Sequence, residues 1–232
     1  MVRLLFLDRD GTLNRTFGAR PPNTPAEVEL LPGTRRVLQA HVTLGWRLVI
    51  VTNQGGVAAG YLTQEQAYAI QRRVVEKLAL PVAASYLCPH MRDAAVADYA
   101  LDCPNRKPKP GFLLTALDTF GALAADCLFV GDSSTDRDAA CAAGVPFCWA
   151  DRFFGRPIDR GVVVGDGKWV QVRQVPAQEA DKKRLVALHK GEVIGCLNVG
   201  GASGACPDLK IANGWEQTAV GRLLIEIGGE CE

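Results

Sequence analysis

The sequence has no excess of charge of one sign and no long apolar run. Its 26 basic and 25 acidic residues leave a formal net charge of +1 over 232 residues, which argues against broad electrostatic binding to nucleic acid or anionic membranes. No stretch approaches the roughly 20 apolar residues of a membrane-spanning helix. The N-terminal apolar run is too short for a signal peptide, and acidic residues follow it where a cleavage site needs small ones. These absences predict a cytoplasmic protein without a membrane partner.

Disulfide bonds are not expected either, although the chain has 8 cysteines. Cytoplasmic proteins rarely keep disulfides, and most of these cysteines lie in apolar runs, where a thiol serves as a small buried side chain. The apolar fraction of 48% is ordinary for a globular protein. The length allows one domain of about 150 residues and a small second module.

Short apolar runs alternate with helical patterns over the first two thirds of the chain. The runs are apolar on both faces, as in buried parallel strands, and they cover residues 4–7, 47–51, 84–87, 127–130 and 146–149. Helices are expected at 34–44, 63–78, 111–120 and 134–143, the second of them with a Thr63–Gln66 capping box. This alternation predicts an open, doubly wound α/β sheet.

Polar residues lie at the ends of three predicted strands: Asp8 and Thr52 follow their strands directly, and Asp132 follows the fourth strand after Gly131. In doubly wound sheets, ligands bind beyond the carboxyl ends of the strands. We therefore expect these three side chains to meet in one crevice, although they lie far apart in sequence.

Two carboxylates, Asp8 and Asp10, lie just past the first strand, and Gly11 allows a sharp turn. One carboxylate of such a pair can attack phosphorus while the other transfers a proton. The hydroxyl of Thr52, followed by Asn53 and a glycine-rich loop with free N–H groups, can hold phosphate oxygens. Each element alone also fits an ordinary turn or helix cap at a strand end.

Two cations, Arg106 and Lys107, precede the third helix, and an acid, Asp132, follows the fourth strand. A lysine at this place can neutralise a phosphoryl group and an attacking carboxylate together, although alone it fits a solvated basic loop. Asp132 can ligate a hard cation such as Mg²⁺. A helix cap from Ser134 or Asp136 is the alternative interpretation of this segment.

Taken in this order, the motifs resemble those of phosphatases of the haloacid dehalogenase (HAD) superfamily. The resemblance is greatest to the subgroup that holds D-glycero-D-manno-heptose 1,7-bisphosphate 7-phosphatase and histidinol-phosphatase. It implies an α/β, HAD-like three-layer domain, and the intervals between motifs are too short for a large cap. The matching stretches are DRDGTLN (8–14), VTNQGGVAAG (51–60), CPH (88–90), RKPKPG (106–111) and VGDSSTD (130–136).

The resemblance implies a Mg²⁺-dependent phosphomonoesterase that works through an aspartyl-phosphate. In this scheme Asp8 is the nucleophile, and Asp10 protonates the leaving group and then activates water. Mg²⁺ would lie on the carboxylates of Asp8 and Asp132 and on the backbone carbonyl of Asp10. The implied phosphate and substrate contacts come from Thr52, Asn53, Arg106 and Lys107.

A short loop carries Cys88, His90 and Cys103. Members of the resembled subgroup often place four such ligands around a structural Zn²⁺, the closed arrangement for zinc. Asn105 stands here where the fourth cysteine would be. Either a weak zinc site, a site completed by another group or a metal-free loop fits this pattern.

The resemblance predicts a sugar bisphosphate such as the heptose bisphosphate as substrate, in an open site roofed by residues 15–32 and 88–105. Ser133 departs from the subgroup, in which heptose phosphatases tend to carry lysine at that place. Histidinol phosphate and the 3′ end of a nucleic acid are the alternatives. The low net charge and the lack of a basic, aromatic strand face disfavour nucleic acid.

The pattern changes after about residue 154. It predicts a phosphatase domain at 1–154, a linker with a short strand at 155–167 and a small α+β module at 168–232. The module has strand patterns at 168–175, 185–189, 192–199 and 209–212 and a helix pattern at 217–227.

This C-terminal module faintly resembles the first half of a GCN5-related N-acetyltransferase, with residues 216–221 as the turn that would hold acetyl-CoA. This turn departs from the family pattern, because Glu216 stands in place of a basic or amide residue and Ala219 in place of a glycine. We therefore expect a catalytically inactive packing surface, open to homodimerisation through a sheet edge. An unrelated α+β extension is the alternative.

Overall fold

The computed structural model describes residues 1–18, 20–164, 168–176, 183–190, 192–199, 209–211, 223 and 227. The chain divides into two compact units, Met1–Arg156 and Pro157–Glu232, and each is described by itself. Among the described residues, no helix is long and apolar enough to cross a membrane.

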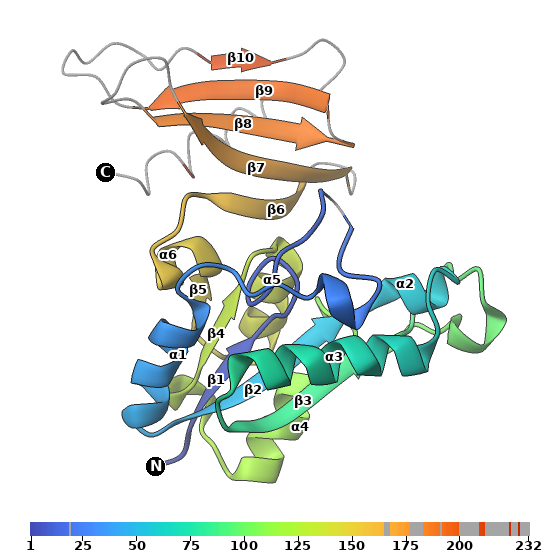
Figure 1. Cartoon of the computed structure of the whole chain (residues 1–232), viewed down its shortest axis with the longest axis vertical. Helices are drawn as coiled ribbons and strands as arrows, with labels where there is room; N and C mark the ends of the chain where they lie inside the picture. The colour runs from blue at the N-terminus through green and yellow to red at the C-terminus, as the bar shows by residue number, and fades with distance from the viewer. Residues whose placement is uncertain are drawn as a thin grey trace. The chain divides into compact units, whose positions relative to one another are not determined.

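The first unit is built on a parallel sheet of five strands in the order β3-β2-β1-β4-β5 (Figure 1). The central strand β1 is buried on both faces, with Leu4–Leu7 fully shielded from solvent, as its unbroken apolar run predicts. The strand order reverses at β1, so the carboxyl ends of β1, β2 and β4 are neighbours. The strands are β1 (Arg3–Leu7), β2 (Trp46–Asn53), β3 (Val82–Cys88), β4 (Leu128–Gly131) and β5 (Phe147–Trp149).

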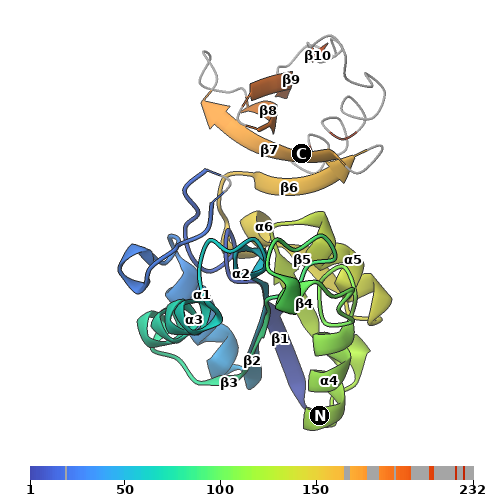
Figure 2. The ribbon, with the colours of Figure 1, turned by 90° about the vertical axis from the view of Figure 1, so that its right-hand side faces the viewer.

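Helices cover both faces of this sheet, which confirms the predicted three-layer architecture (Figure 2). α1 (Thr34–Thr43) and α3 (Gln64–Leu78) pack on one face, and α4 (Gly111–Phe120) and α5 (Ser134–Ala142) on the other. Several short helices carry too few residues for a periodic pattern to reveal them. These are α2 (Gly55–Ala58), α6 (Ala150–Phe154) and the 3₁₀ helices η1 (Pro25–Glu27), η2 (Ala97–Tyr99) and η3 (Ala124–Asp126).

The second unit contains an antiparallel sheet in the order β10-β9-β8-β7-β6. Val170, Val172 and Leu185 lie in its core. The segment expected to be a linker with a short strand contains β6, which pairs with β7 at all 6 of its residues and so belongs to this sheet. The strands are β6 (Asp159–Val164), β7 (Lys168–Pro176), β8 (Lys183–His189), β9 (Glu192–Val199) and β10 (Leu209–Ile211).

The predicted C-terminal helix and acetyl-CoA turn fall largely on residues that are not described. Leu223 and Ile227, the two described residues of the expected helix 217–227, are both helical. The turn at 216–221 lies outside the described residues.

The capping box at the start of α3 is formed as predicted. Thr63 Oγ1 accepts from the Gln66 N–H at 3.2 Å, and Gln66 Oε1 accepts from the Thr63 N–H at 2.7 Å. We expect Thr63→Ala to lower the free energy of unfolding by about 1 kcal/mol, because the helix loses a cap. The control is Thr115→Ala, at an exposed position in the middle of α4, and it should change the free energy of unfolding little. Equal urea midpoints for the two variants would contradict the prediction.

Candidate active site

A buried ion cluster lies at the carboxyl end of the central strands. Asp8, the residue after β1, is 7% exposed, and its N–H donates to the carbonyl of Val130 in β4 at 3.0 Å. Lys107 Nζ lies 2.6 Å from Asp8 Oδ1 and 2.6 Å from Asp136 Oδ1, and it donates to the Val51 carbonyl at 2.9 Å. One lysine therefore links the ends of β1 and β2 to the first turn of α5.

The cluster carries more negative than positive charge. Asp8, Asp132 and Asp136 each offer a carboxylate oxygen, and these oxygens lie within 4.8 Å of one another. Burial raises the pKa of Asp8 to about 6 against the opposing effect of Lys107, and burial and the charge of Asp8 raise the pKa of Asp132 well above its usual range. The pKa of Lys107 is raised because Asp136 and Asp8 outweigh its own burial. Three hard oxygen donors around one lysine fit a divalent cation such as Mg²⁺.

The backbone of the turn that follows β1 lies against the carboxylate of Asp132. Gly11 has φ +86°, and a Cβ atom there would lie 2.2 Å from Asp132 Oδ2, so no side chain fits without moving the carboxylate. The next residue, Thr12, donates from Oγ1 to Asp132 Oδ1 at 3.1 Å. The glycine predicted only for a sharp turn thus also makes room for the acid.

Asp10 lies beside this cluster and is held by donors of its own. Arg9, a fully buried residue, donates to it from Nε and Nη2, the latter at 2.8 Å. Asn14 Nδ2 donates to Oδ1 at 2.9 Å and Gln54 Nε2 to Oδ2 at 2.7 Å. These charged and amide donors hold the Asp10 carboxylate in one orientation.

Gln54 joins two of the predicted site residues. Its Nε2 donates to the buried Thr52 Oγ1 at 2.9 Å as well as to Asp10, and its backbone N–H donates to the Cys88 carbonyl at 2.7 Å. Neither Gln54 nor Arg9 was predicted as a site residue. Their signal in the sequence was their place beside predicted residues, at the ends of β2 and β1.

The amide of Asn53 holds the backbone of Lys107. Its Nδ2 donates to the Lys107 carbonyl at 2.9 Å, and its Oδ1 accepts from the Lys107 N–H at 3.1 Å. These two bonds place the lysine backbone at the end of β2. The expected contact between Asn53 and substrate stays a prediction.

Arg106 is tied to the cysteine-bearing loop. Its Nη1 donates to the His90 carbonyl at 3.0 Å, and its N–H donates to the Cys103 carbonyl at 3.2 Å. Burial lowers its pKa, and the sulfur atoms of Cys88 and Cys103 oppose this change.

Three predicted metal ligands of that loop come together. The ligand atoms of Cys88, His90 and Cys103 lie within 4.8 Å of one another, with Cys88 Sγ 3.9 Å from His90 Nδ1. Burial raises the pKa of Cys88 to about 11. Asn105 places its Oδ1 against Gly111, where a Cβ atom would lie 2.2 Å from that oxygen. Three nitrogen and sulfur donors fit a zinc ion that still lacks one ligand.

Asp136 was predicted only as an alternative helix cap. It is part of a cap, because its Oδ2 accepts from the N–H and Oγ of Ser133, the N-cap of α5, at 3.1 and 2.7 Å. Its other oxygen pairs with Lys107. Its place at the end of the matching stretch VGDSSTD (130–136) was the available signal.

Comparison with known proteins shows which family of enzymes this chain is similar to. Residues 104–152 match the family model described as HAD-hydrolase-like. A Rhodopseudomonas palustris protein named D-glycero-beta-D-manno-heptose-1,7-bisphosphate 7-phosphatase is 32% identical over 157 residues, which are 66% of this chain and 84% of the relative. An Escherichia coli K12 protein of the same name is 35% identical over 147 residues, 62% of this chain and 76% of the relative.

Two solved structures agree with the sequence matches. A HAD-like phosphatase from Mesorhizobium loti is 34% identical with a TM-score of 0.58, covering 62% of this chain and 69% of the other. The D,D-heptose 1,7-bisphosphate phosphatase of B. bronchiseptica, solved with magnesium and phosphate, is 32% identical with a TM-score of 0.56, covering 63% and 79%.

Fold and site together are those of a HAD-type hydrolase of phosphoric monoesters that uses Mg²⁺. The chain belongs to the HAD phosphatases, in the group that contains the D-glycero-D-manno-heptose-1,7-bisphosphate 7-phosphatases. The predicted resemblance of the N-terminal region is confirmed.

We expect Gly11→Ala to weaken Mg²⁺ binding at least tenfold, because the added Cβ would displace the Asp132 carboxylate. Gly18→Ala is the matched control, since Gly18 also has a positive φ, +66°, but nothing within 4 Å of the added atom. Both variants carry the cost of a left-handed alanine, and only Gly11→Ala carries the clash. Calorimetric titration with Mg²⁺ measures the difference, and similar affinities for the two variants would argue against it.

The raised pKa of Asp8 predicts a pH dependence of stability in metal-free protein. Because the pKa is higher in the folded state, Asp8 stabilises the fold most at low pH, and this contribution is lost as pH rises through about 6. Relative to Asp8→Asn, wild type should lose on the order of 2–3 kcal/mol of unfolding free energy between pH 4 and pH 7. Urea unfolding with chelator measures this difference, and a pH-independent difference would refute it.

Proposed function

We propose that the phosphatase reaction takes place at the buried ion cluster, with Asp8 as the nucleophile. The observation that carries this proposal is the contact of Asp8 with Lys107 in a group of three carboxylates. A carboxylate attacks an anionic phosphate only where the negative charge of both is compensated. Lys107 supplies part of that compensation and fixes the orientation of Asp8.

We propose that Asp8 and Asp132, together with the backbone carbonyl of Asp10, hold Mg²⁺, and that Asp136 supports the same site through Lys107. The excess of carboxylates over cations at the cluster supports this assignment. When bound, Mg²⁺ neutralises charge on the phosphoryl oxygens and on the nucleophile.

In the first half-reaction a carboxylate oxygen of Asp8 forms a bond to phosphorus while the bond from phosphorus to the ester oxygen breaks. Asp10 gives its proton to the departing alcohol. In the second half-reaction Asp10 takes a proton from water, the water oxygen attacks phosphorus, and the Asp8 carboxylate is released with inorganic phosphate. Thr52 and Lys107 bind the transferred group, and Asn53 and Arg106 lie toward the substrate.

The hydrogen bonds to Asp10 fix the orientation of its carboxylate. Arg9, Asn14 and Gln54 all donate to its oxygens. To act as an acid in the first step, Asp10 must exchange some of these donors for the ester oxygen of the substrate.

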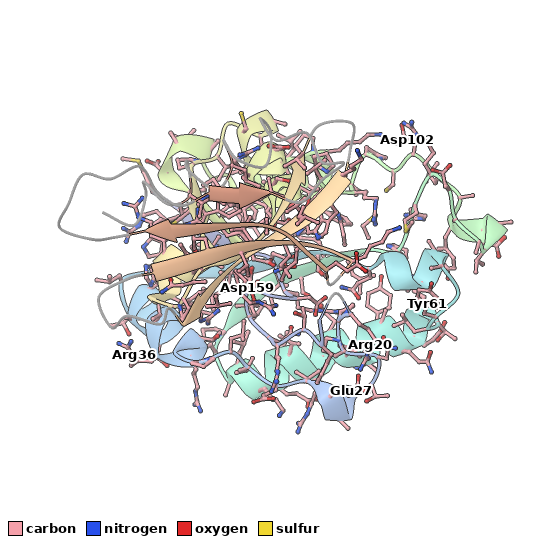
Figure 3. The ribbon with its side chains drawn as sticks, turned by 90° about the horizontal axis from the view of Figure 1, so that it is seen from above. Arg20, Glu27, Arg36, Tyr61, Asp102 and Asp159 are labelled. Carbon is pink, nitrogen blue, oxygen red and sulfur yellow. The ribbon has the colours of Figure 1, made fainter. Side chains whose placement is uncertain are left out.

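A sugar bisphosphate such as D-glycero-D-manno-heptose 1,7-bisphosphate is the proposed substrate. The names of the relatives support this class. In the described residues of the segments 15–32 and 89–105, the helices are the short η1 and η2, which supports an open site without a large cap. The first of these loops is closed by the pair Arg20–Glu27, with Nη1 2.9 Å from Oε2 (Figure 3).

Phosphate release with Mg²⁺ tests the reaction and the substrate together. The panel contains heptose 1,7-bisphosphate, histidinol phosphate and a 3′-phosphorylated oligonucleotide. We expect the highest kcat/KM on the heptose bisphosphate and a loss of at least 10³-fold in Asp8→Asn, which removes the nucleophile. Asp118→Asn, on the exposed side of α4, is the matched control and should keep full activity.

Faster release from histidinol phosphate or the oligonucleotide would replace the proposed substrate and leave the mechanism in place. Equal activity of Asp8→Asn and wild type would reject Asp8 as the nucleophile.

We also propose a structural zinc ion on Cys88, His90 and Cys103. Because three donors gather there among the described residues, Asn105→Cys should add a fourth and raise the zinc content of protein purified without chelator. Cys103→Ser should lower the zinc content below that of wild type. Metal analysis by mass spectrometry measures all three proteins, and less than a tenth of an equivalent of zinc in each would exclude the site.

A further inference from the structure

Arg156, the last residue of the first unit, reaches back to the segment that follows the nucleophile. Its Nη1 donates to the Thr12 carbonyl at 2.8 Å, and its Nε donates to the Pro32 carbonyl at 2.9 Å. Its Nη2 donates to Thr34 Oγ1 at 2.6 Å, and its guanidinium lies 4.1 Å from the centroid of the Phe154 ring. A single side chain thus joins three segments that are distant in sequence.

The partners of this guanidinium are all uncharged. In the described part of the chain no carboxylate pairs with Arg156, and burial lowers its pKa to about 10. A partly desolvated arginine with no counter-ion is costly to keep. Its rigid fork of donors suits it to holding several fixed acceptors at once, which a lysine does less well. Arg156 therefore binds two backbone carbonyls, of Thr12 and Pro32, and one hydroxyl, of Thr34. We call this set of contacts the Arg156 clamp.

The clamp acts on the residue that positions Asp132. Thr12 is held at its carbonyl by Arg156, and its Oγ1 donates to Asp132 Oδ1 at 3.1 Å. Thr34, another partner of Arg156, has one hydroxyl proton, and its Oγ1 lies 2.8 Å from the Leu31 carbonyl and 3.2 Å from the Leu13 carbonyl. Arg156 therefore holds the backbone of Thr12 at its carbonyl, while the Thr12 hydroxyl contacts the acid cluster.

We propose that Arg156 is a positioning residue for the cation site, which it supports through Thr12 and Asp132. This inference rests on the proposed function, in which Asp132 is a Mg²⁺ ligand. Arg156 touches neither substrate nor cation. It keeps the turn after Asp8 in the position at which the carboxylates of Asp8, Asp132 and Asp136 converge.

Mg²⁺ binding to the full chain, measured by calorimetry without substrate, tests the inference. Loss of the clamp removes one support of the Thr12–Asp132 hydrogen bond, so Arg156→Ala should raise the Kd for Mg²⁺ about fivefold. Arg156→Lys should recover part of the affinity, because one donor remains. Arg152→Ala, an exposed arginine in the preceding helix α6, is the matched control and should bind Mg²⁺ as wild type does.

A double-mutant cycle shows whether the effect runs through Thr12. Thr12→Val removes the hydrogen bond to Asp132 directly, and its effect on the Kd should be less than additive with that of Arg156→Lys. At saturating Mg²⁺ the KM for substrate should stay unchanged in Arg156→Lys. Because this cycle uses Arg156→Lys, it still tests whether Arg156 supports Mg²⁺ binding through Thr12 if Arg156→Ala does not fold.

Wild-type Mg²⁺ affinity in Arg156→Lys and in a folded Arg156→Ala would overturn the proposal and leave Arg156 as a tether of α6. Additive effects in the cycle would overturn the route through Thr12. A weakened Mg²⁺ affinity in a protein that hydrolyses no phosphomonoester would uphold the positioning role and reject the proposed function instead, because the binding readout does not depend on turnover.

Discussion

The ion pair between Lys107 and Asp8 is the interaction on which the rest of the site depends. Both groups are buried, and removing one would leave the other charged in a poorly solvated place. Lys107 can make the pair only because Asn53 fixes its backbone and Asp136 holds the far side of its ammonium group. Lys107 also offsets part of the repulsion between Asp8 and Asp136, because its ammonium group contacts both carboxylates.

Around this pair the site has an inner set of charged groups and an outer set of residues that hold them. Arg9 and Gln54 bind Asp10, Thr12 binds Asp132, and Ser133 binds Asp136. Most of these outer contacts start within two residues of a strand end, so the sheet sets their direction. Substrate-facing loops can therefore differ between relatives while the charged groups keep their geometry.

The sequence was sufficient to predict the sheet, the main helices and the meeting of Asp8, Thr52 and Asp132 at one edge, because buried strands and strand-end polar residues leave a local pattern. It was not sufficient for Arg9, Gln54 or Arg156, whose roles depend on partners distant in sequence. Asp136 was predicted only as a cap, since local spacing shows the cap and not the lysine beside it. β6 was expected as a short strand within a linker, because the local pattern indicates a strand but does not show that it pairs with β7.

The long sequence separations within the site have a consequence for how the chain folds. Asp8 and Lys107 are 99 residues apart, Thr12 and Asp132 120, and Thr12 and Arg156 144. Contacts of such separation form only after large loops have closed, which is slow and occurs late. No fragment shorter than almost the entire first unit contains the complete site. Recovery of hydrolysis after dilution from denaturant therefore follows the last stage of refolding, whereas helical signals from α3 or α4 report earlier stages.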